Sequence, residues 1–192
     1  MLTQLPGFRD PVHQAQHTFR VLLDCLAHPG TLGAIEVDLE APEELALACA
    51  ATCLTLLDLE TLVWLQPSLS ETARRWLQFH TGCRLTADPQ RAKFALVVEA
   101  ATCPPLASFA LGTPDYPEDA TTVLLQLPSL TAGESVSLRG PGIRDRQVIS
   151  PALPQGFWPQ WQGNQRHYPL GVDVFCLAST QVMALPRSSI ME

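Results

Sequence analysis

The chain has 192 residues, of which 46% are hydrophobic and 16% are charged, and its formal net charge is −7. This length favours a single domain spanning residues 1–192, and the negative charge argues against nucleic-acid binding, which needs basic contacts to phosphates. No run of about 18 apolar residues predicts a membrane span, and so low a charged fraction indicates that another chain covers part of the surface.

The N-terminal half alternates helical and extended patterns. Asp10 and Pro11 are typical of a helix start, apolar residues then recur at helical spacing, and Pro29-Gly30 ends the helix. Ser70 is expected to cap a later helix. The patterns predict, in order, the helix from 11, a strand over 31–37, a helix over 42–57, a strand over 61–66, a helix from 71 and a buried strand over 94–99.

The C-terminal half is richer in extended patterns. We expect a short helix after Pro104-Pro105, a loop over 112–119, and a helix over 157–165 that Pro159 breaks. The predicted strands are 121–127 paired with 135–139, then 147–149, and finally 172–177 and 182–185 as a hairpin around Ser179-Thr180. Together the elements predict a single α/β domain with a mixed β-sheet flanked by helices.

The clustered positive charge lies in one short segment, in which Arg139, Arg144 and Arg146 surround Gly140-Pro141-Gly142. Guanidinium groups bind phosphate or carboxylate oxygens in a forked geometry, and a glycine turn can expose backbone N–H groups to the same anion. The segment is therefore a candidate anion-binding or partner-binding site. The alternative is an ordinary hairpin turn with solvated charges on its flanks.

Other motifs carry less chemistry. His13 and His17 lie four residues apart, but Gln14 stands where a zinc protease would have its catalytic glutamate, so we expect a polar helix face and no metal site. Six cysteines without a CxxC pair are expected to be buried thiols. Weaker candidates for anion or partner contact are the side chains of His17, Arg20, His80 and Arg187.

The chain has one lysine, Lys93, which any Schiff-base or pyridoxal enzyme would have to use. A lysine just before a predicted strand, as here, is more typical of a solvent-exposed residue at the end of the strand. The sequence has no Gly-x-x-x-x-Gly-Lys-Ser/Thr loop, no Gly-x-Gly-x-x-Gly after a strand and no Gly-x-Ser-x-Gly elbow. A self-contained nucleotide-binding enzyme or hydrolase is therefore poorly supported.

Several segments, in colinear order over residues 10–187, resemble the PhnH subunit family of the bacterial carbon–phosphorus lyase system. Each segment is short, but the set is specific. The matching segments are Pro11-Val12, Ala15-Gln16-His17, Phe19-Arg20, Leu22-Leu23, Pro29-Gly30, Val63-Trp64-Leu65, Phe79-His80-Thr81, Gly112-Thr113, Leu124-Leu125-Gln126, Gly140-x-Gly142-Ile143, Pro169-Leu170-Gly171-Val172-Asp173 and Leu185-Pro186-Arg187.

This resemblance implies a fold like the large domain of pyridoxal-phosphate-dependent transferases, but without that cofactor. It implies a homodimer when isolated and assembly with PhnG, PhnI and PhnJ subunits. With PhnG, PhnI and PhnL, the family supports displacement of adenine from MgATP by a phosphonate, which gives a ribose 1-phosphonate 5-triphosphate. The radical cleavage of the carbon–phosphorus bond belongs to PhnJ.

Two hypotheses about this chain remain open. It is either a non-catalytic structural subunit of that transferase, or it contributes Arg139, Arg144 and Arg146 to an anion or nucleotide site. The absence of a phosphate loop, a nucleophile or a general acid in a recognisable motif favours the structural role. The N-terminal segment, residues 1–10, has neither a basic region nor an apolar region of a secretory signal, so we expect a cytoplasmic protein.

Overall fold

The computed structural model describes residues 5–192, so the first four residues of the expected domain lie outside the described part. A mixed seven-stranded sheet forms the centre of the α/β fold. Its strands, in chain order, are β1 (Gly33–Ala34), β2 (Leu62–Leu65), β3 (Arg84–Thr86), β4 (Phe94–Val97), β5 (Thr122–Gln126), β8 (Asp173–Ala178) and β9 (Gln181–Leu185). In space they follow the order β1-β9-β8-β5-β4-β2-β3, and β9 alone among them runs antiparallel to the others.

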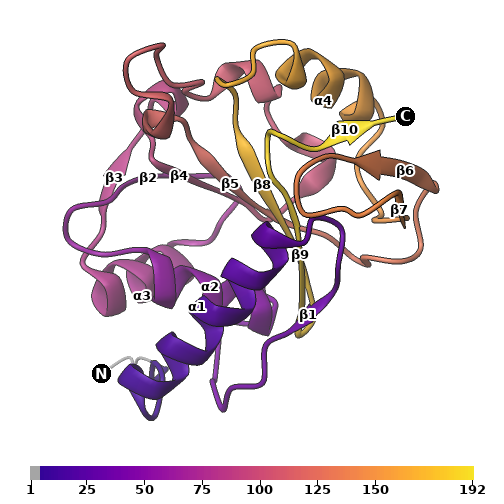
Figure 1. Ribbon diagram of the computed structural model, residues 1–192. Helices are drawn as coiled ribbons and strands as arrows, with labels where there is room; N and C mark the ends of the chain where they lie inside the picture. The colour runs from indigo at the N-terminus through magenta and orange to yellow at the C-terminus, as the bar shows by residue number, and fades with distance from the viewer. Residues whose placement is uncertain (1–4) are drawn as a thin grey trace.

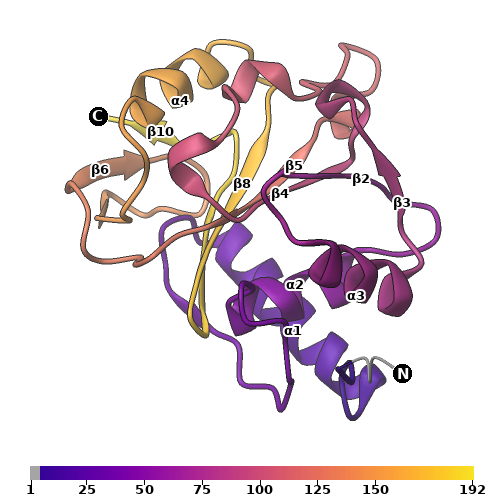
Figure 2. The same cartoon turned by 180° about the vertical axis from the view of Figure 1, so that it is seen from behind.

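Three helices cover one face of this sheet: α1 (Pro11–Ala27), α2 (Leu47–Leu56) and α3 (Glu71–Thr81) (Figures 1 and 2). They pack on it through a buried apolar cluster that includes Leu22, Ala48 and Leu77. The opposite face carries α4 (Phe157–Gln165) and a small antiparallel sheet. The strands of that sheet are β6 (Val136–Arg139), β7 (Gln147–Ile149) and β10 (Ile190–Met191), in the order β10-β6-β7.

Short 3₁₀ turns complete the fold. They are η1 (Pro89–Arg91), η2 (Ala100–Thr102), η3 (Leu106–Ser108) and η4 (Pro117–Asp119). The turn η3 corresponds to the short helix expected after Pro104-Pro105. None of the helices in residues 5–192 is long and apolar enough to cross a lipid bilayer.

The predicted helix starts are confirmed. The Asp10 side chain accepts a hydrogen bond from the backbone N–H of His13, and Ser70 caps α3 by accepting one from Ala73. Such caps satisfy backbone donors that have no partner in the first turn of a helix. The C-terminal hairpin is also confirmed, because β8 and β9 pair around Ser179-Thr180 with Ser179 at φ 51°.

The expected pairing of segments 121–127 and 135–139 is wrong. Strand β5 lies between β4 and β8 in the large sheet, whereas β6 pairs with β7 and β10 in the small one. Val123, Leu124 and Leu125 of β5 are all completely buried. A strand covered on both faces is typical of the centre of a parallel sheet, and this is the physical reason why β5 does not form a simple hairpin with its neighbour in sequence.

The expected break at Pro159 is also wrong. Pro159 is the third residue of α4, and the helix continues through it to Gln165. The backbone N–H groups of the first turn have no partner within a helix, so a proline there removes no hydrogen bond. Other boundaries differ: β1 is two residues long, α2 begins at Leu47, and β3 and β10 were not predicted.

All six cysteines are free, and five of them are buried. Burial raises the pKa of Cys25 to about 11 and that of Cys176 to about 12. The thiolate is the reactive form of cysteine, so these protonated thiols are inert at neutral pH and act as packing residues.

Candidate functional site

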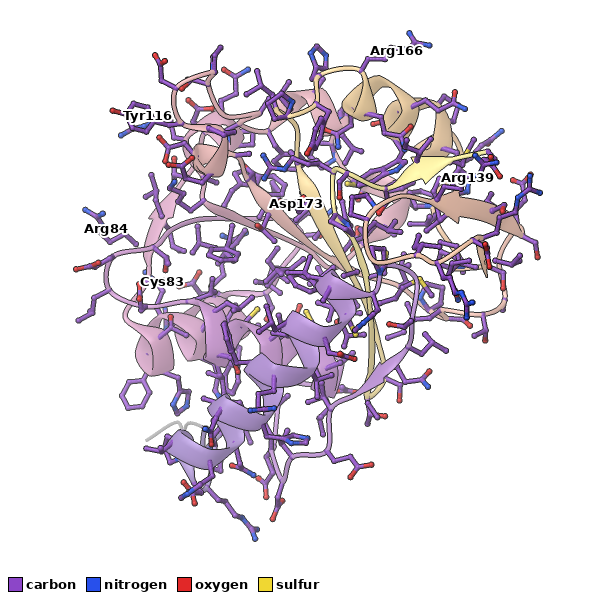
Figure 3. All side chains as sticks on the ribbon, in the orientation of Figure 1. Cys83, Arg84, Tyr116, Arg139, Arg166 and Asp173 are labelled. Carbon is purple, nitrogen blue, oxygen red and sulfur yellow. The ribbon has the colours of Figure 1, made fainter. Side chains whose placement is uncertain are left out.

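The three arginines of the sequence motif lie in the connection between β6 and β7, which we call the arginine turn (residues 139–146). Its charges are partly paired. The side chain of Glu192 places one oxygen 2.6 Å from Nε of Arg139 and the other 3.1 Å from Nε of Arg146. Glu192 is brought there by β10, which pairs with β6 so that Ile190 lies opposite Arg139. Arg139 is labelled in Figure 3. The turn therefore already holds one carboxylate.

Arg144 is exposed and makes no ion pair with any residue in the described part of the chain. It lines an open depression of about 610 Å³ together with Arg139, Ile143, Asp145 and Arg146. Three arginines opposed by Asp145 and Glu192 leave one net positive charge at this place. A net charge of +1 suits a single carboxylate better than a nucleoside triphosphate, which carries about four negative charges. Protein sites for nucleoside triphosphates also commonly contain a phosphate-binding loop and Mg²⁺.

The glycines of the turn are required by packing. Gly142 has φ +81°, and a Cβ atom on it would lie 1.9 Å from the carbonyl oxygen of Ala27 at the end of α1. Gly140 has φ +137°, and a Cβ atom on it would lie 2.7 Å from the carbonyl oxygen of Ser188. The turn is thus held between the end of α1 and the segment that precedes β10, so its arginines are displayed from a fixed backbone.

Arg187, a weaker candidate from the sequence, lies in a mostly buried ion pair. Its Nε is 3.1 Å from each carboxylate oxygen of Asp173, and its backbone N–H donates to the same carboxylate at 2.7 Å. The guanidinium also donates to the carbonyl oxygen of Pro117 at 2.8 Å. The two side chains are 15% and 22% exposed. The guanidinium of Arg187 is thus engaged by Asp173 and Pro117 inside the fold.

This ion pair joins two of the segments on which the family resemblance rests, and further contacts bring in residues that flank a third, Gly112-Thr113. Asp173 ends the segment Pro169–Asp173, and Arg187 ends Leu185-Pro186-Arg187. The loop that follows Gly112 supplies Pro117, and the N–H of Gly171 donates to the carbonyl oxygen of Leu111 at 2.8 Å. Segments far apart in the sequence therefore meet at the N-terminal ends of the central strands β5 and β8.

The histidine candidates do not form a site together. In the last turn of α3, Nε2 of His80 is 3.0 Å from the carbonyl oxygen of Leu5, which also accepts from Nε1 of Trp76. His80 thus holds the N-terminal segment. His17 and Arg20 are exposed on α1. The backbone N–H of His13 and then its ring, which is 2.7 Å from Asp10, lower the pKa of the Asp10 carboxyl group. No group of three or more His, Cys, Asp or Glu side chains within residues 5–192 is arranged to hold a metal ion.

Lys93 precedes β4 and forms an ion pair with the carboxylate of Asp119 in η4. It thereby fixes the same loop that Arg187 holds from the other side through Pro117. Both contacts lie where the parallel strands begin, whereas ligands of open α/β sheets bind outside the carboxyl ends of the strands.

Gln66, which was not among the candidates predicted from the sequence, lies at the carboxyl ends of the parallel strands. The chain passes from β2 outward to β3 and returns to β4 on the opposite side of β2, so the strand order reverses between β2 and β4. Ligands of open α/β sheets bind in the crevice at such a reversal. Gln66, which follows β2, is 3% exposed and fills this position.

The hydrogen bonds of Gln66 are all made inside the protein. Its side-chain carbonyl oxygen accepts from the N–H groups of Val98 and Glu99 at 2.9 and 2.8 Å. Its amide nitrogen donates to the carbonyl oxygen of Glu99 at 3.1 Å and to the hydroxyl of Thr102 at 2.9 Å. The backbone N–H groups that could bind a ligand at this edge are thus already satisfied. A glutamine directly after an apolar strand was the only sequence signal, and by itself it does not indicate this role.

Comparison with known proteins matches residues 6–192 to the family model described as "Bacterial phosphonate metabolism protein (PhnH)". The chain belongs to the PhnH family. It is 40% identical over 188 residues to the alpha-D-ribose 1-methylphosphonate 5-triphosphate synthase subunit PhnH of Rhizobium meliloti (strain 1021), which covers 97% of this chain and 94% of the relative. It is also 34% identical over 80 residues to the putative C-P lyase subunit protein HtxG of Stutzerimonas stutzeri, over 41% of each chain. The resemblance seen in the sequence is confirmed.

The packing of the arginine turn can be tested with two matched glycines. Gly142 and Gly156 both have φ +81°, but a Cβ atom on Gly156 would have no neighbour within 4 Å. We expect Gly156→Ala to cost about 1–2 kcal/mol in the free energy of unfolding, because it adds backbone strain alone. Gly142→Ala should cost a further ~1–3 kcal/mol, because its methyl group clashes with the end of α1. Urea unfolding measures both, and equal losses would show that the turn does not pack tightly on α1.

Proposed function

We propose that this chain is a subunit of the carbon–phosphorus lyase complex of phosphonate catabolism and has a structural role there. In this proposal it supports, with PhnG, PhnI and PhnL subunits, the transfer of the ribose triphosphate of ATP to a phosphonate with release of adenine. The observation that carries the proposal is the match, over 97% of the chain, to a relative named as a subunit of ribose 1-methylphosphonate 5-triphosphate synthase.

The contacts at both edges of the large sheet support a structural role over a catalytic one. The crevice at the strand reversal is filled by Gln66, and the one lysine is engaged by Asp119 at the opposite edge. Burial raises the pKa of the Cys25 and Cys176 thiols and so holds them in their protonated form. In this proposal the nucleotide chemistry belongs to PhnI, and the radical cleavage of the carbon–phosphorus bond belongs to PhnJ.

We further propose that residues 1–192 form one cytoplasmic PhnH-like domain whose fold corresponds to the large domain of pyridoxal-phosphate-dependent transferases. The mixed seven-stranded sheet with its single antiparallel strand β9 supports this correspondence. The cofactor does not follow from the fold, because function depends on the residues of a site. Lys93 lies at the edge where strands begin, away from the edge where such sheets bind ligands.

In the complex we propose PhnG, PhnI and PhnJ as partners and the arginine turn as a contact for a partner's carboxylate. The exposed Arg144 and the single net charge of the turn support this. The alternative function is that Arg139, Arg144 and Arg146 bind a nucleotide or another anion directly. The two differ in whether loss of the arginines weakens assembly or only the reaction.

For the isolated chain we propose a homodimer formed through α1. Val12, Phe19 and Leu23 are 74%, 48% and 54% exposed, and their spacing of seven and four residues places them on one stripe of the helix. The stripe faces away from the buried side of α1, which carries Thr18, Leu22 and Cys25. In an antiparallel pairing of two α1 helices around a two-fold axis, Val12 of one copy would lie opposite Leu23 of the other, so the stripe is self-complementary.

The structural role is tested by the Arg139→Ala/Arg144→Ala double variant. Because a charge-assisted pair contributes about 1.5–3 kcal/mol, we expect a roughly ten- to hundred-fold loss of affinity for co-expressed PhnG, PhnI and PhnJ, with adenine release falling in proportion. Arg166→Ala, an exposed arginine at the end of α4, serves as the control (Figure 3). Intact assembly with abolished adenine release would contradict the structural role and favour the alternative.

The homodimer is tested by Phe19→Glu/Leu23→Glu. Both side chains are about half exposed, so the fold should tolerate the change, while two buried charges at the interface should prevent association. Sedimentation should give a dimer for the wild type and a monomer for the variant. Phe79→Glu, on α3 and 69% exposed, should remain dimeric. A monomeric wild type, or a dimeric α1 variant, would disprove this interface.

A further inference from the structure

A groove with both apolar and polar walls lies beside the arginine turn, and its polar residues include Glu134, Gln155 and Glu192. Its volume is about 640 Å³, and it is formed where the first turn of α4 faces the small sheet. Its apolar lining comes from Val136, Leu153, Pro154, Trp158 and Met191. The Trp158 ring contacts Phe157 edge-on with the ring centroids 5.5 Å apart, and this contact helps to fix the aromatic wall. A groove of this kind can accept a large apolar side chain.

The groove and the arginine turn are continuous. Glu192 lines the groove, and its carboxylate pairs with Arg139 and Arg146 of the turn. Strand β6 also connects them, because Ser137 lines the groove and Arg139, two residues further, lines the depression of the turn. Two residues of a strand span about 6.6 Å. One extended ligand of two to three residues could therefore reach both places.

The chemistry of the two places defines the ligand. The groove offers one aromatic and aliphatic wall beside polar residues such as Glu134, and the side chains of the turn offer a net charge of +1, with Arg144 unpaired among the described residues. Glu192 demonstrates that a side-chain carboxylate fits between the arginines. A polypeptide with an apolar anchor next to an acidic residue satisfies both places at once, whereas a free anion would leave the groove empty.

We propose that the groove and the arginine turn together form one docking surface for a segment of a partner subunit. The segment is extended, and it carries a large aliphatic or aromatic side chain within three residues of an aspartate or glutamate. The carboxylate of the segment binds Arg144 and competes with Glu192 for Arg139 and Arg146. The apolar side chain packs on Trp158. The proposal rests on the proposed function, since it names where that partner contact lies and which residues it needs.

The surface is tested with the full chain and the co-purified PhnG, PhnI and PhnJ subunits. Arg144→Glu reverses an exposed charge that makes no ion pair within residues 5–192, so the fold should persist. We expect at least a ten-fold loss of affinity for the partner subcomplex. Trp158→Ala should give a similar loss, and the two effects should be less than additive because both residues bind one segment. Arg166→Glu should stay within two-fold of the wild type.

The outcomes separate this inference from the function on which it rests. If the wild type binds the subcomplex and Arg144→Glu binds equally well, the docking surface is wrong and the proposed function stands. If the wild type does not bind the subcomplex, both are wrong. Should Trp158→Ala unfold, which circular dichroism would reveal, Arg144→Glu still decides the question alone.

The chemistry of the occupant is tested by a photo-crosslinking amino acid in place of Gln155, an exposed residue on the rim of the groove. In the assembled complex it should crosslink to a partner peptide in which a large apolar residue lies within three residues of an aspartate or glutamate. A crosslink to a second copy of this chain, or to a partner peptide without an acidic residue, would overturn the proposal.

Discussion

The ion pair between Asp173 and Arg187 is the interaction on which the arrangement of the chain most depends. It joins the start of β8 to the segment after β9 and, through the carbonyl oxygen of Pro117, the loop before β5. Both side chains are mostly buried, so loss of either one would leave an uncompensated charge at a cost of about 3–5 kcal/mol. From this point β5 and β8 enter the centre of the sheet, and the chain beyond Arg187 continues to β10 and Glu192.

Internal contacts at both ends of the large-sheet strands leave few polar groups there for a ligand or partner. At the edge where the parallel strands begin, Arg187 and Lys93 are engaged with loop residues, and at the opposite edge Gln66 satisfies the N–H groups of the strand reversal. The side chains of Arg187, Lys93 and Gln66 thus bind other residues of the chain. The open groove at Trp158 of α4 and the side chain of Arg144, which has no ion-pair partner among residues 5–192, lie instead beside the small sheet. A chain with only 16% charged residues and this distribution is suited to assembly with other proteins.

Much of the fold follows from local sequence signals. Asp10, Ser70 and the Ser179-Thr180 hairpin were predictable because caps and tight turns depend on neighbouring residues. Strand pairing was not, because the position of β5 between β4 and β8 depends on burial of both faces. The arginine cluster was visible in the sequence, but its partner Glu192 was not, because their contact requires β10 to pair with a strand 51 residues earlier in the chain. The role of Gln66 was not predictable for the same reason, because its hydrogen-bond partners Val98 and Glu99 lie more than 30 residues away in the sequence.

The central claim is that this chain supports the reaction without holding the nucleotide itself. Titration calorimetry of MgATP into the isolated chain tests it most directly. With the strand reversal closed by Gln66 and a net charge of only +1 at the arginine turn, the account predicts no saturable binding at concentrations up to about 1 mM. Saturable binding of one MgATP per chain, lost on substitution of Arg139 and Arg144, would contradict it and place the nucleotide site on this subunit.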